Sequence, residues 1–153
     1  LNMSHSKAKR KSMAYSSLEN VLTLLKIHYN IDCEDYYIHV NFPTGIPVDG
    51  PSAGVAMFCS IYSAIFEEPI PGNIAMTGEV TIHGEVYPVG GVSEKILAAK
   101  KAGAKAVIIP KENMQSTFLD CGIEVITVQT VDEVVNYLWD MPIRKKAEHI
   151  LHA

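Results

Sequence analysis

The sequence predicts one mixed α/β domain, and three observations lead to that prediction. The chain has 153 residues, which is enough to bury a substantial core within one domain. Its hydrophobic fraction is 48% and its charged fraction is 20%, as is typical of a soluble globular protein. The second half alternates helical and strand patterns, which favours parallel strands joined by right-handed crossovers. The first half is more typical of an antiparallel or mixed sheet.

The first half of the chain predicts two helices with a strand between them. Apolar residues recur at helical spacing from Ser12 to about Tyr29, which indicates an amphipathic helix. Residues 36–42 alternate and are rich in β-forming side chains, so they predict a strand. The prolines and glycines of residues 43–50 predict a loop. Residues 51–66 are apolar almost all round, which is typical of a helix buried on most faces.

The second half predicts short strands separated by helices. The expected strands cover residues 74–77, 81–86 with Val89, 107–109 and 123–128, with a tight turn at Gly84. The expected helices cover residues 93–102, 113–119 and 130–139. Gly103 closes the first of these helices, and Thr130 with Glu133 has the spacing of a capping box at the start of the last.

Charge and cysteine content limit the partners and the compartment. The net charge is −4, so no broad basic surface is expected and nucleic-acid binding is not predicted. A basic run lies within residues 1–11, which we expect to be a mobile segment before a domain over 12–142 and a polar tail over 143–153. Three widely spaced cysteines, with no signal peptide and no membrane-spanning run, indicate a reducing, cytoplasmic location. Membrane attachment of a longer parent protein stays open.

Ser52 is the first candidate catalytic residue. It lies in the sequence Gly-Pro-Ser-Ala-Gly over residues 50–54, at the start of an expected helix. This pattern also occurs in the nucleophile elbow of α/β-hydrolases, but residues 47–49 predict a loop where that elbow needs a strand, and no histidine is suitably placed. Alternatively, Ser52 only caps the helix. Small neighbours that leave room for a substrate, and free N–H groups at a helix start that can hold an oxyanion, favour a nucleophile.

Lys95 is the candidate base for that serine. It follows Gly90 and Gly91 in the first turn of an expected helix, where the helix dipole and burial would both favour the neutral amine. A neutral amine can accept the proton of a serine hydroxyl and return it to the leaving amine. The alternative is an exposed lysine without a role. The sequence contains no phosphate-binding loop and no metal-ligand spacing, so no cofactor or metal is expected in this chain.

With these residues in place, the chain resembles the proteolytic domain of the Lon proteases, ATP-dependent serine peptidases of family S16 with a Ser–Lys dyad. The resemblance runs from about Tyr36 to Val128. It rests on residues 49–54, 76–80, 89–95, 102–105 and 107–113. Residues 41–43 and 47–49 are more similar to the B-type than to the A-type of the family.

The resemblance implies a fold and a role for each site residue. The fold would be that of the Lon proteolytic domain, which is ribosomal protein S5 domain 2-like, with mixed sheets and packed helices. Ser52 would be the nucleophile, Lys95 the general base, and Thr77 the residue that hydrogen-bonds the lysine amine. Asp49 would be the loop acid that can contact the dyad and hold it inactive. Without such roles, Thr77 is a strand-end threonine and Asp49 a turn carboxylate, while Glu79 is only a candidate wall residue.

The resemblance also implies partners outside this chain. The family carries an upstream AAA+ ATPase module, which would hold ATP and Mg²⁺, and it assembles into hexameric rings. The substrates would be unfolded or damaged polypeptides. By the same resemblance, we expect the first strands of the family's protease domain to be missing before Ser12. The alternative function is a catalytically silent assembly or interaction module of the same fold.

Overall fold

The computed structural model describes residues 12–42 and 50–140. The four α-helices within these residues are α1 Met13–Tyr29, α2 Gly54–Phe66, α3 Val92–Lys101 and α4 Val131–Trp139. The strands are β1 Ile74–Met76, β2 Glu79–Val80, β3 Val86–Tyr87, β4 Ala106–Pro110 and β5 Glu124–Val128. Short 3-10 helices cover Cys33–Asp35, Pro51–Ala53, Lys111–Asn113 and Ser116–Phe118. The segments expected at residues 1–11 and 143–153 lie outside the described residues.

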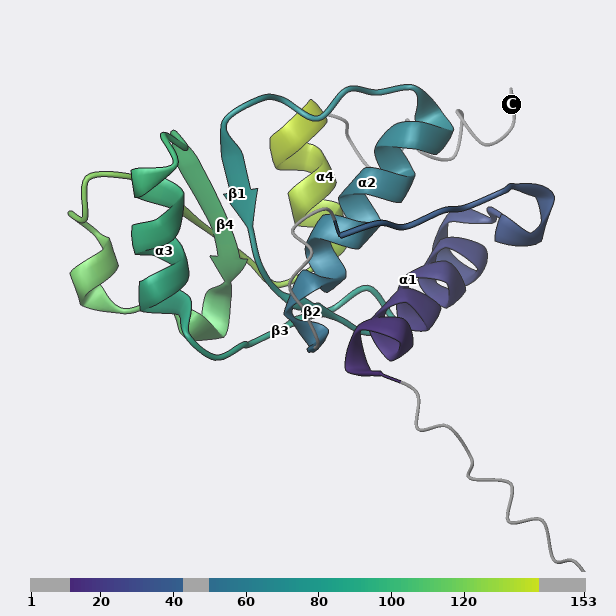
Figure 1. The fold of residues 1–153 in the computed structure, drawn as a ribbon, viewed down its shortest axis with the longest axis horizontal. Coiled ribbons are helices and arrows are strands. Elements are labelled where there is room, and N and C mark those ends of the chain that lie inside the picture. Colours follow the sequence, from purple (N-terminus) through teal and green to yellow (C-terminus); the bar gives the residue numbers. More distant parts are fainter. Residues whose placement is uncertain (1–11, 43–49, 141–153) are drawn as a thin grey trace, which may run out of the picture.

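A three-stranded parallel sheet forms the centre of the fold, in the order β1-β4-β5. Ile74 pairs with Ala106 and Ile108 with Ile126, so the parallel pairing expected for the second half is confirmed. Strands β2 and β3 form a separate antiparallel pair. Figure 1 shows α3 on one side of the parallel sheet and α1, α2 and α4 on the other. The molecule is therefore a mixed α/β domain, as predicted.

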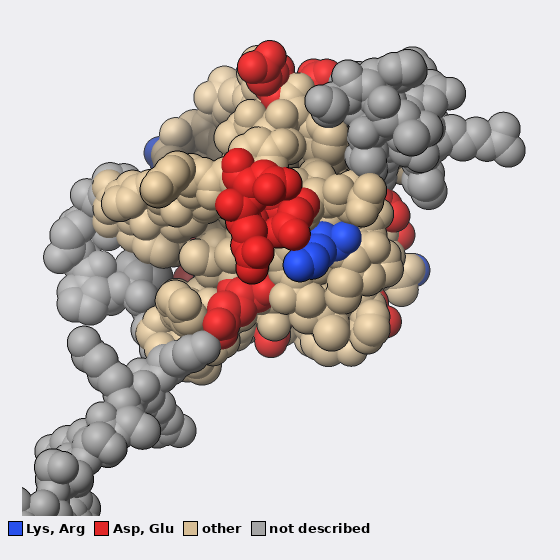
Figure 2. Space-filling model, turned by 90° about the vertical axis from the view of Figure 1, so that its right-hand side faces the viewer, with Lys and Arg blue, Asp and Glu red and all other residues tan. Residues whose placement is uncertain are grey.

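A small acidic turn follows α1, at residues 32–35. Asp32 caps the turn by accepting the Glu34 N–H at 3.0 Å, and it pairs with Lys26 at 3.3 Å. Figure 2 shows acidic side chains gathered beside a lysine on one face of the molecule. The Glu34 N–H, followed by Lys26, lowers the pKa of Asp32. Because both members of the pair are well exposed, the ion pair adds little stability.

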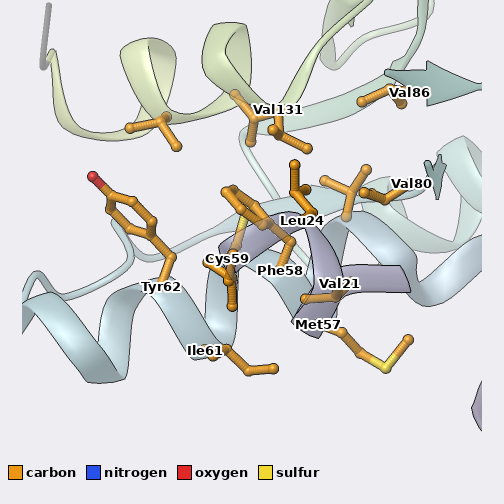
Figure 3. Close-up of a cluster of buried hydrophobic side chains, with 14 of the residues drawn as sticks. Val21, Leu24, Met57, Phe58, Cys59, Ile61, Tyr62, Val80, Val86 and Val131 are labelled. Atoms are coloured by element: carbon orange, nitrogen blue, oxygen red, sulfur yellow. The ribbon is translucent and has the colours of Figure 1, made fainter. Parts of the chain in front are cut away.

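Two apolar clusters lie on opposite faces of β4, because successive side chains of a strand point to opposite sides. Val107 and Ile109 pack against α3, whereas Ile108 faces the larger cluster beneath α1, α2 and α4. Figure 3 shows Phe58 and Cys59 of α2 inside this larger cluster. Burial raises the pKa of the Cys59 thiol to about 12, as expected for a cysteine that serves as packing.

Side-chain caps mark the helix starts that the sequence predicts. Ser12 Oγ accepts the Tyr15 N–H at 3.1 Å at the start of α1, and Thr130 Oγ1 accepts the Glu133 N–H at 3.3 Å at the start of α4. The Glu133 carboxylate accepts the N–H of Gln129 at 2.8 Å, one residue before the cap. The capping role of Thr130 is therefore confirmed, with Glu133 reaching one residue further back than the usual box.

The strand expected over residues 36–42 is wrong. These residues pair with no strand in the part of the chain that the structure describes, and Tyr37 is fully exposed. Alternating β-forming side chains can pack on the surface of a sheet, but a strand also needs a neighbouring strand to hydrogen-bond with. A local pattern of side chains cannot supply that neighbour, because the pairing depends on a segment elsewhere in the chain.

Two further elements differ from the sequence prediction. Residues 81–85 form the turn between β2 and β3 rather than a strand, because Thr81 Oγ1 accepts the N–H groups of His83 and Glu85 at 3.3 and 3.2 Å. The tight turn at Gly84 is confirmed by its φ of +84°. The helix expected over residues 113–119 is replaced by two 3-10 turns, because Met114 between them is extended.

Candidate functional site

Ser52 lies in the 3-10 turn Pro51–Ala53 and is half-buried at the start of α2. Gly50 enters the turn with φ +147°, a conformation that favours glycine, and Pro51 occupies the first helical position. The turn is bound to the chain just after β1. Gly78 N–H donates to Ser52 O at 3.1 Å, and Val55 N–H donates to Gly78 O at 3.1 Å. The Ser52 backbone is thus held between the sheet and α2.

Two glycines allow this close contact. A Cβ at Gly54 would lie 2.8 Å from Val80 N, and a Cβ at Gly78 would lie 2.7 Å from the side chains of Val55 and Val86. Real Cβ atoms essentially never approach so closely. Gly54 therefore makes room for the protein's own backbone, which corrects the expectation that it opens space for a substrate.

Lys95 lies in the first turns of α3 and is half-buried. Gly91 caps this helix with φ +66° and accepts the Lys95 N–H at 3.1 Å. Lys95 Nζ donates to Thr77 Oγ1 at 3.4 Å, and Thr77 Oγ1 donates to Ser52 O at 3.3 Å. Thr77 is only 5% exposed, so these contacts lie beneath the surface. Three residues from three separate elements therefore meet at one point.

The contacts reach the carbonyl oxygen of Ser52 rather than its hydroxyl. The hydrogen bonds between described residues include none from Lys95 Nζ to Ser52 Oγ. Two of the helix-start donors expected to hold an oxyanion are also engaged. Gly54 N–H bonds Pro51 O, and Val55 N–H bonds Gly78 O. The structure thus brings the candidate residues together in an arrangement that is not yet set for proton transfer.

The remaining site predictions fall at the edge of this arrangement. Asp49 lies outside the described residues. Glu79 is half-buried in β2, directly after Gly78 and opposite Tyr87 in the β2–β3 pair. It makes no hydrogen bond to Ser52 or Lys95 among the described residues and does not line the groove beside α2, so its role as a wall residue stays a prediction.

Asn113 is a residue that the sequence reasoning missed. Its Oδ1 accepts the Val89 N–H at 2.9 Å, and its Nδ2 donates to Val89 O at 2.9 Å. Val89 opens the short link that leads into α3. No spacing in the sequence points to this contact, because the partner of Asn113 is the backbone of a residue 24 positions away.

An apolar groove of about 590 Å³ runs along one side of α2. Residues 36–42 form one wall, and the other wall is formed by small and apolar side chains of the Pro51–Ala53 turn and α2, followed by Glu67. They are Ala53, Ala56, Met57, Ser60, Ile61, Ala64 and Ile65. Ala53 is the residue next to Ser52, so the groove extends to the edge of the site.

Neither a metal site nor a membrane span is found in the same part of the chain. Within 12–42 and 50–140, no three His, Cys, Asp or Glu side chains lie close enough to hold a metal ion. No helix in those ranges is both long enough and apolar enough to cross a membrane.

The fold and these contacts define a mixed α/β domain in which a serine and a lysine, each at a helix start, are linked through a buried threonine. The family model of the Lon protease (S16) C-terminal proteolytic domain matches residues 5–140. The chain therefore belongs to that family, and the resemblance seen in the sequence is confirmed.

Curated relatives agree with this assignment. The chain is 52% identical to Lon protease 2 of Bacillus subtilis (strain 168) over 144 residues, covering 93% of this chain and 26% of that protein. It is 40% identical to the Lon protease of Rickettsia prowazekii (strain Madrid E) over 139 residues, covering 86% of this chain and 18% of that protein. The chain thus spans about a quarter or less of these relatives. Their names do not separate the B-type from the A-type, so that assignment stays a prediction.

Proposed function

We propose that this chain is the proteolytic module of a Lon-type protease and that it hydrolyses peptide bonds with Ser52 as nucleophile and Lys95 as general base. The observation that carries the proposal is the link from Lys95 Nζ through Thr77 Oγ1 to Ser52 O, with contacts of 3.4 and 3.3 Å. Family membership gives this link its meaning, because the relatives are named as proteases.

In the proposed reaction, Ser52 Oγ attacks the carbonyl carbon of a peptide bond while its proton passes to the neutral amine of Lys95. The tetrahedral intermediate then collapses, the C–N bond breaks, and Lys95 returns the proton to the leaving amine. Water attacks the resulting ester with Lys95 again as base, which releases the acid and restores Ser52. Thr77 orients the lysine amine during both steps.

The proposed reaction requires a small rearrangement from the present geometry. Nζ must come within about 2.6–3.2 Å of Ser52 Oγ while it stays within reach of Thr77 Oγ1. The Ser52 carbonyl is held by both Thr77 and Gly78, so side-chain rotation is the simplest route. We assign Asp49, in the loop before the nucleophile, the role of stabilising the unassembled state.

The proposal extends to the longer protein. Unfolded or damaged polypeptides would be its substrates, and an AAA+ module of the same polypeptide would hold ATP and Mg²⁺ and deliver them. A homo-oligomeric ring, six subunits by analogy with the family, would enclose the sites in the cytoplasm. This chain itself would need no cofactor.

The test is hydrolysis of a fluorescent unstructured protein by the full chain and by matched variants. Ser52→Ala and Lys95→Ala should each lower kcat at least about 1000-fold, because members of a catalytic unit fail together. The exposed residues Ser116 and Lys101 supply the controls Ser116→Ala and Lys101→Ala, which should retain the rate within about twofold.

Two outcomes would contradict the proposal in different ways. If the parent chain cleaves nothing, alone or fused to the ATPase module of a relative, the domain is a silent assembly module. If it cleaves and Lys95→Ala keeps the full rate, the chain is a peptidase but the dyad is wrong.

A further inference from the structure

The Asn113 side chain is bonded to both backbone polar groups of one residue, Val89. Its oxygen accepts the Val89 N–H and its nitrogen donates to the Val89 carbonyl, each at 2.9 Å. A planar amide with both ends engaged fixes the position and the orientation of the peptide that it holds. Val89 is 24 residues away in sequence, so this contact ties the end of the Lys111–Asn113 turn to the link before α3.

That link leads directly to Lys95. Gly90 and Gly91 follow Val89, Gly91 caps α3, and Gly91 O accepts the Lys95 N–H at 3.1 Å. Glycine allows the widest range of backbone conformations, so two consecutive glycines leave this link with little conformational restriction of its own. Without the Asn113 hydrogen bonds to Val89, the start of α3 would be set by apolar packing, that of α3 on β4 and that of the Val89 side chain on the same cluster.

The position of the Lys95 amine depends on where the start of α3 lies. Its Nζ lies 3.4 Å from Thr77 Oγ1, which is longer than the usual 2.7–3.2 Å of such hydrogen bonds. Because the lysine stem is flexible, a displaced start of α3 would let Nζ settle away from Thr77 Oγ1. The packing of Val92, Ile96 and Ala99 against β4 fixes the helix body, and the Val89 side chain packs against the same cluster, whereas the Val89 peptide is held by Asn113.

We propose that Asn113 is a positioning residue for Lys95 and that it acts by fixing Val89 at the entrance to α3. This inference rests on the proposed function, because it gives Asn113 a role in catalysis through the candidate base. Asn113 has no contact with Ser52, Thr77 or Lys95 among the described hydrogen bonds, so it acts only through the backbone link.

The first measurement does not depend on activity. Hydrogen exchange of the full chain, read by mass spectrometry, should show residues 89–95 exchanging at least about tenfold faster in Asn113→Ala, because that variant removes both bonds. Asn113→Asp keeps the acceptor for Val89 N–H but repels Val89 O, so it should give a smaller increase. The control is Asn136→Ala on the exposed face of α4, which should leave residues 89–95 unchanged. Unchanged exchange in Asn113→Ala would overturn the proposal whether or not the chain is a peptidase.

The second measurement separates positioning from loss of fold. In peptide hydrolysis, Asn113→Ala should lower kcat about tenfold with KM within about twofold, because a displaced base slows the chemical step rather than substrate binding. The fraction of Ser52 that reacts with an organophosphate at saturation should match that of Asn136→Ala. An unchanged kcat, or a fall in kcat matched by an equal fall in reactive Ser52, would overturn the positioning role. A different outcome would refute the proposed function: the exchange result holds, but in the parent chain Ser52 is not labelled and peptides are not cleaved. Asn113 would then fix the start of α3 in a chain without a peptidase site, and the positioning role would fail as well.

Discussion

Thr77 contacts both candidate catalytic residues. Its backbone N–H donates to Ile108 O at 3.0 Å, which extends the pairing of β1 with β4, while its hydroxyl bonds Ser52 O and Lys95 Nζ. The backbone of Thr77 thus belongs to the sheet, and its side chain belongs to the site. Changing only the side chain should therefore disturb the site without disturbing the strand.

Thr77→Val tests this division, because valine has nearly the same shape but no hydroxyl. The change leaves Ser52 O with one bond fewer and Lys95 Nζ without its acceptor, so we expect kcat to fall about tenfold or more, with about 1–3 kcal/mol lost from the free energy of unfolding. Thr77→Ser keeps the hydroxyl and should retain most of the rate. Peptide hydrolysis and urea unfolding measure the two effects. Equal rates for the valine and serine variants would show that the hydroxyl has no catalytic role.

The residue scale also shows how far a sequence can identify a site. Ser52 and Lys95 could be selected because glycines and helix starts surround them, and these are local patterns. Asn113 could not, because its partner is the backbone of Val89, which only the folded chain brings near. A side chain that binds a distant backbone group produces no residue spacing in the sequence that could identify it.

At the scale of elements, the backbone at the start of α2 packs directly against the backbone of β2. A Cβ added at Gly54 would lie 2.8 Å from Val80 N and 3.1 Å from Gly78 O. Glycine in a helix is normally unfavourable by about 1 kcal/mol relative to alanine. Its presence here follows from the contact with β2 rather than from the needs of the helix.

Gly54→Ala should therefore destabilise the domain, despite the better helix propensity of alanine. The new methyl group meets backbone atoms that cannot rotate away, so we expect a loss of about 1–3 kcal/mol and a displaced Ser52 turn with reduced hydrolysis. Gly72→Ala is the control, since a Cβ added at Gly72 would have no other atom within 4 Å. Thermal and urea unfolding of both variants provide the comparison. A Gly54→Ala variant as stable as the parent would mean that α2 moves freely over β2.

Elements were predictable where the pattern that defines them is local. Helices α1 and α4 and strands β4 and β5 follow from periodicity and caps. Residues 36–42 carry a strand pattern but find no partner in the part of the chain described here, so pairing decided the outcome. Thr81, whose hydroxyl shapes the turn before Gly84, shows the opposite case, in which one side chain overrides a run of β-formers.

At the scale of the whole molecule, the larger cluster is built around buried aromatic rings. Tyr62 of α2 stacks on Trp139 of α4 with ring centroids 5.1 Å apart, and it contacts Tyr29 of α1 edge-on at 5.7 Å. The Tyr29 hydroxyl donates to Asp132 Oδ1 at 2.7 Å. The core that joins three helices thus contains groups that can lose a proton at high pH.

These groups predict a loss of stability at alkaline pH. Burial raises the pKa of Cys59 from 9.0 to about 12 and that of Tyr62 from 10.0 to about 12, and burial with the Asp132 hydrogen bond raises the pKa of Tyr29. The unfolded chain releases these protons near the ordinary values while the folded chain retains them. Their contribution is therefore fully present below about pH 9 and is lost as the pH rises toward about 12.

Urea unfolding under reducing conditions at about pH 8, 10 and 11 measures this loss. The free energy of unfolding should fall steadily across the series for the parent chain. Tyr29→Phe should start lower at about pH 8, because the bond to Asp132 is gone, and should then fall less steeply above about pH 10. Tyr36→Phe, at a position 48% exposed, should follow the parent slope. Only a difference in the pKa of Tyr29 between the folded and unfolded chains can make the free energy of unfolding of Tyr29→Phe change less steeply with pH. If Tyr29→Phe and Tyr36→Phe show the same dependence on pH, the buried Tyr29 hydroxyl does not retain its proton in the folded state.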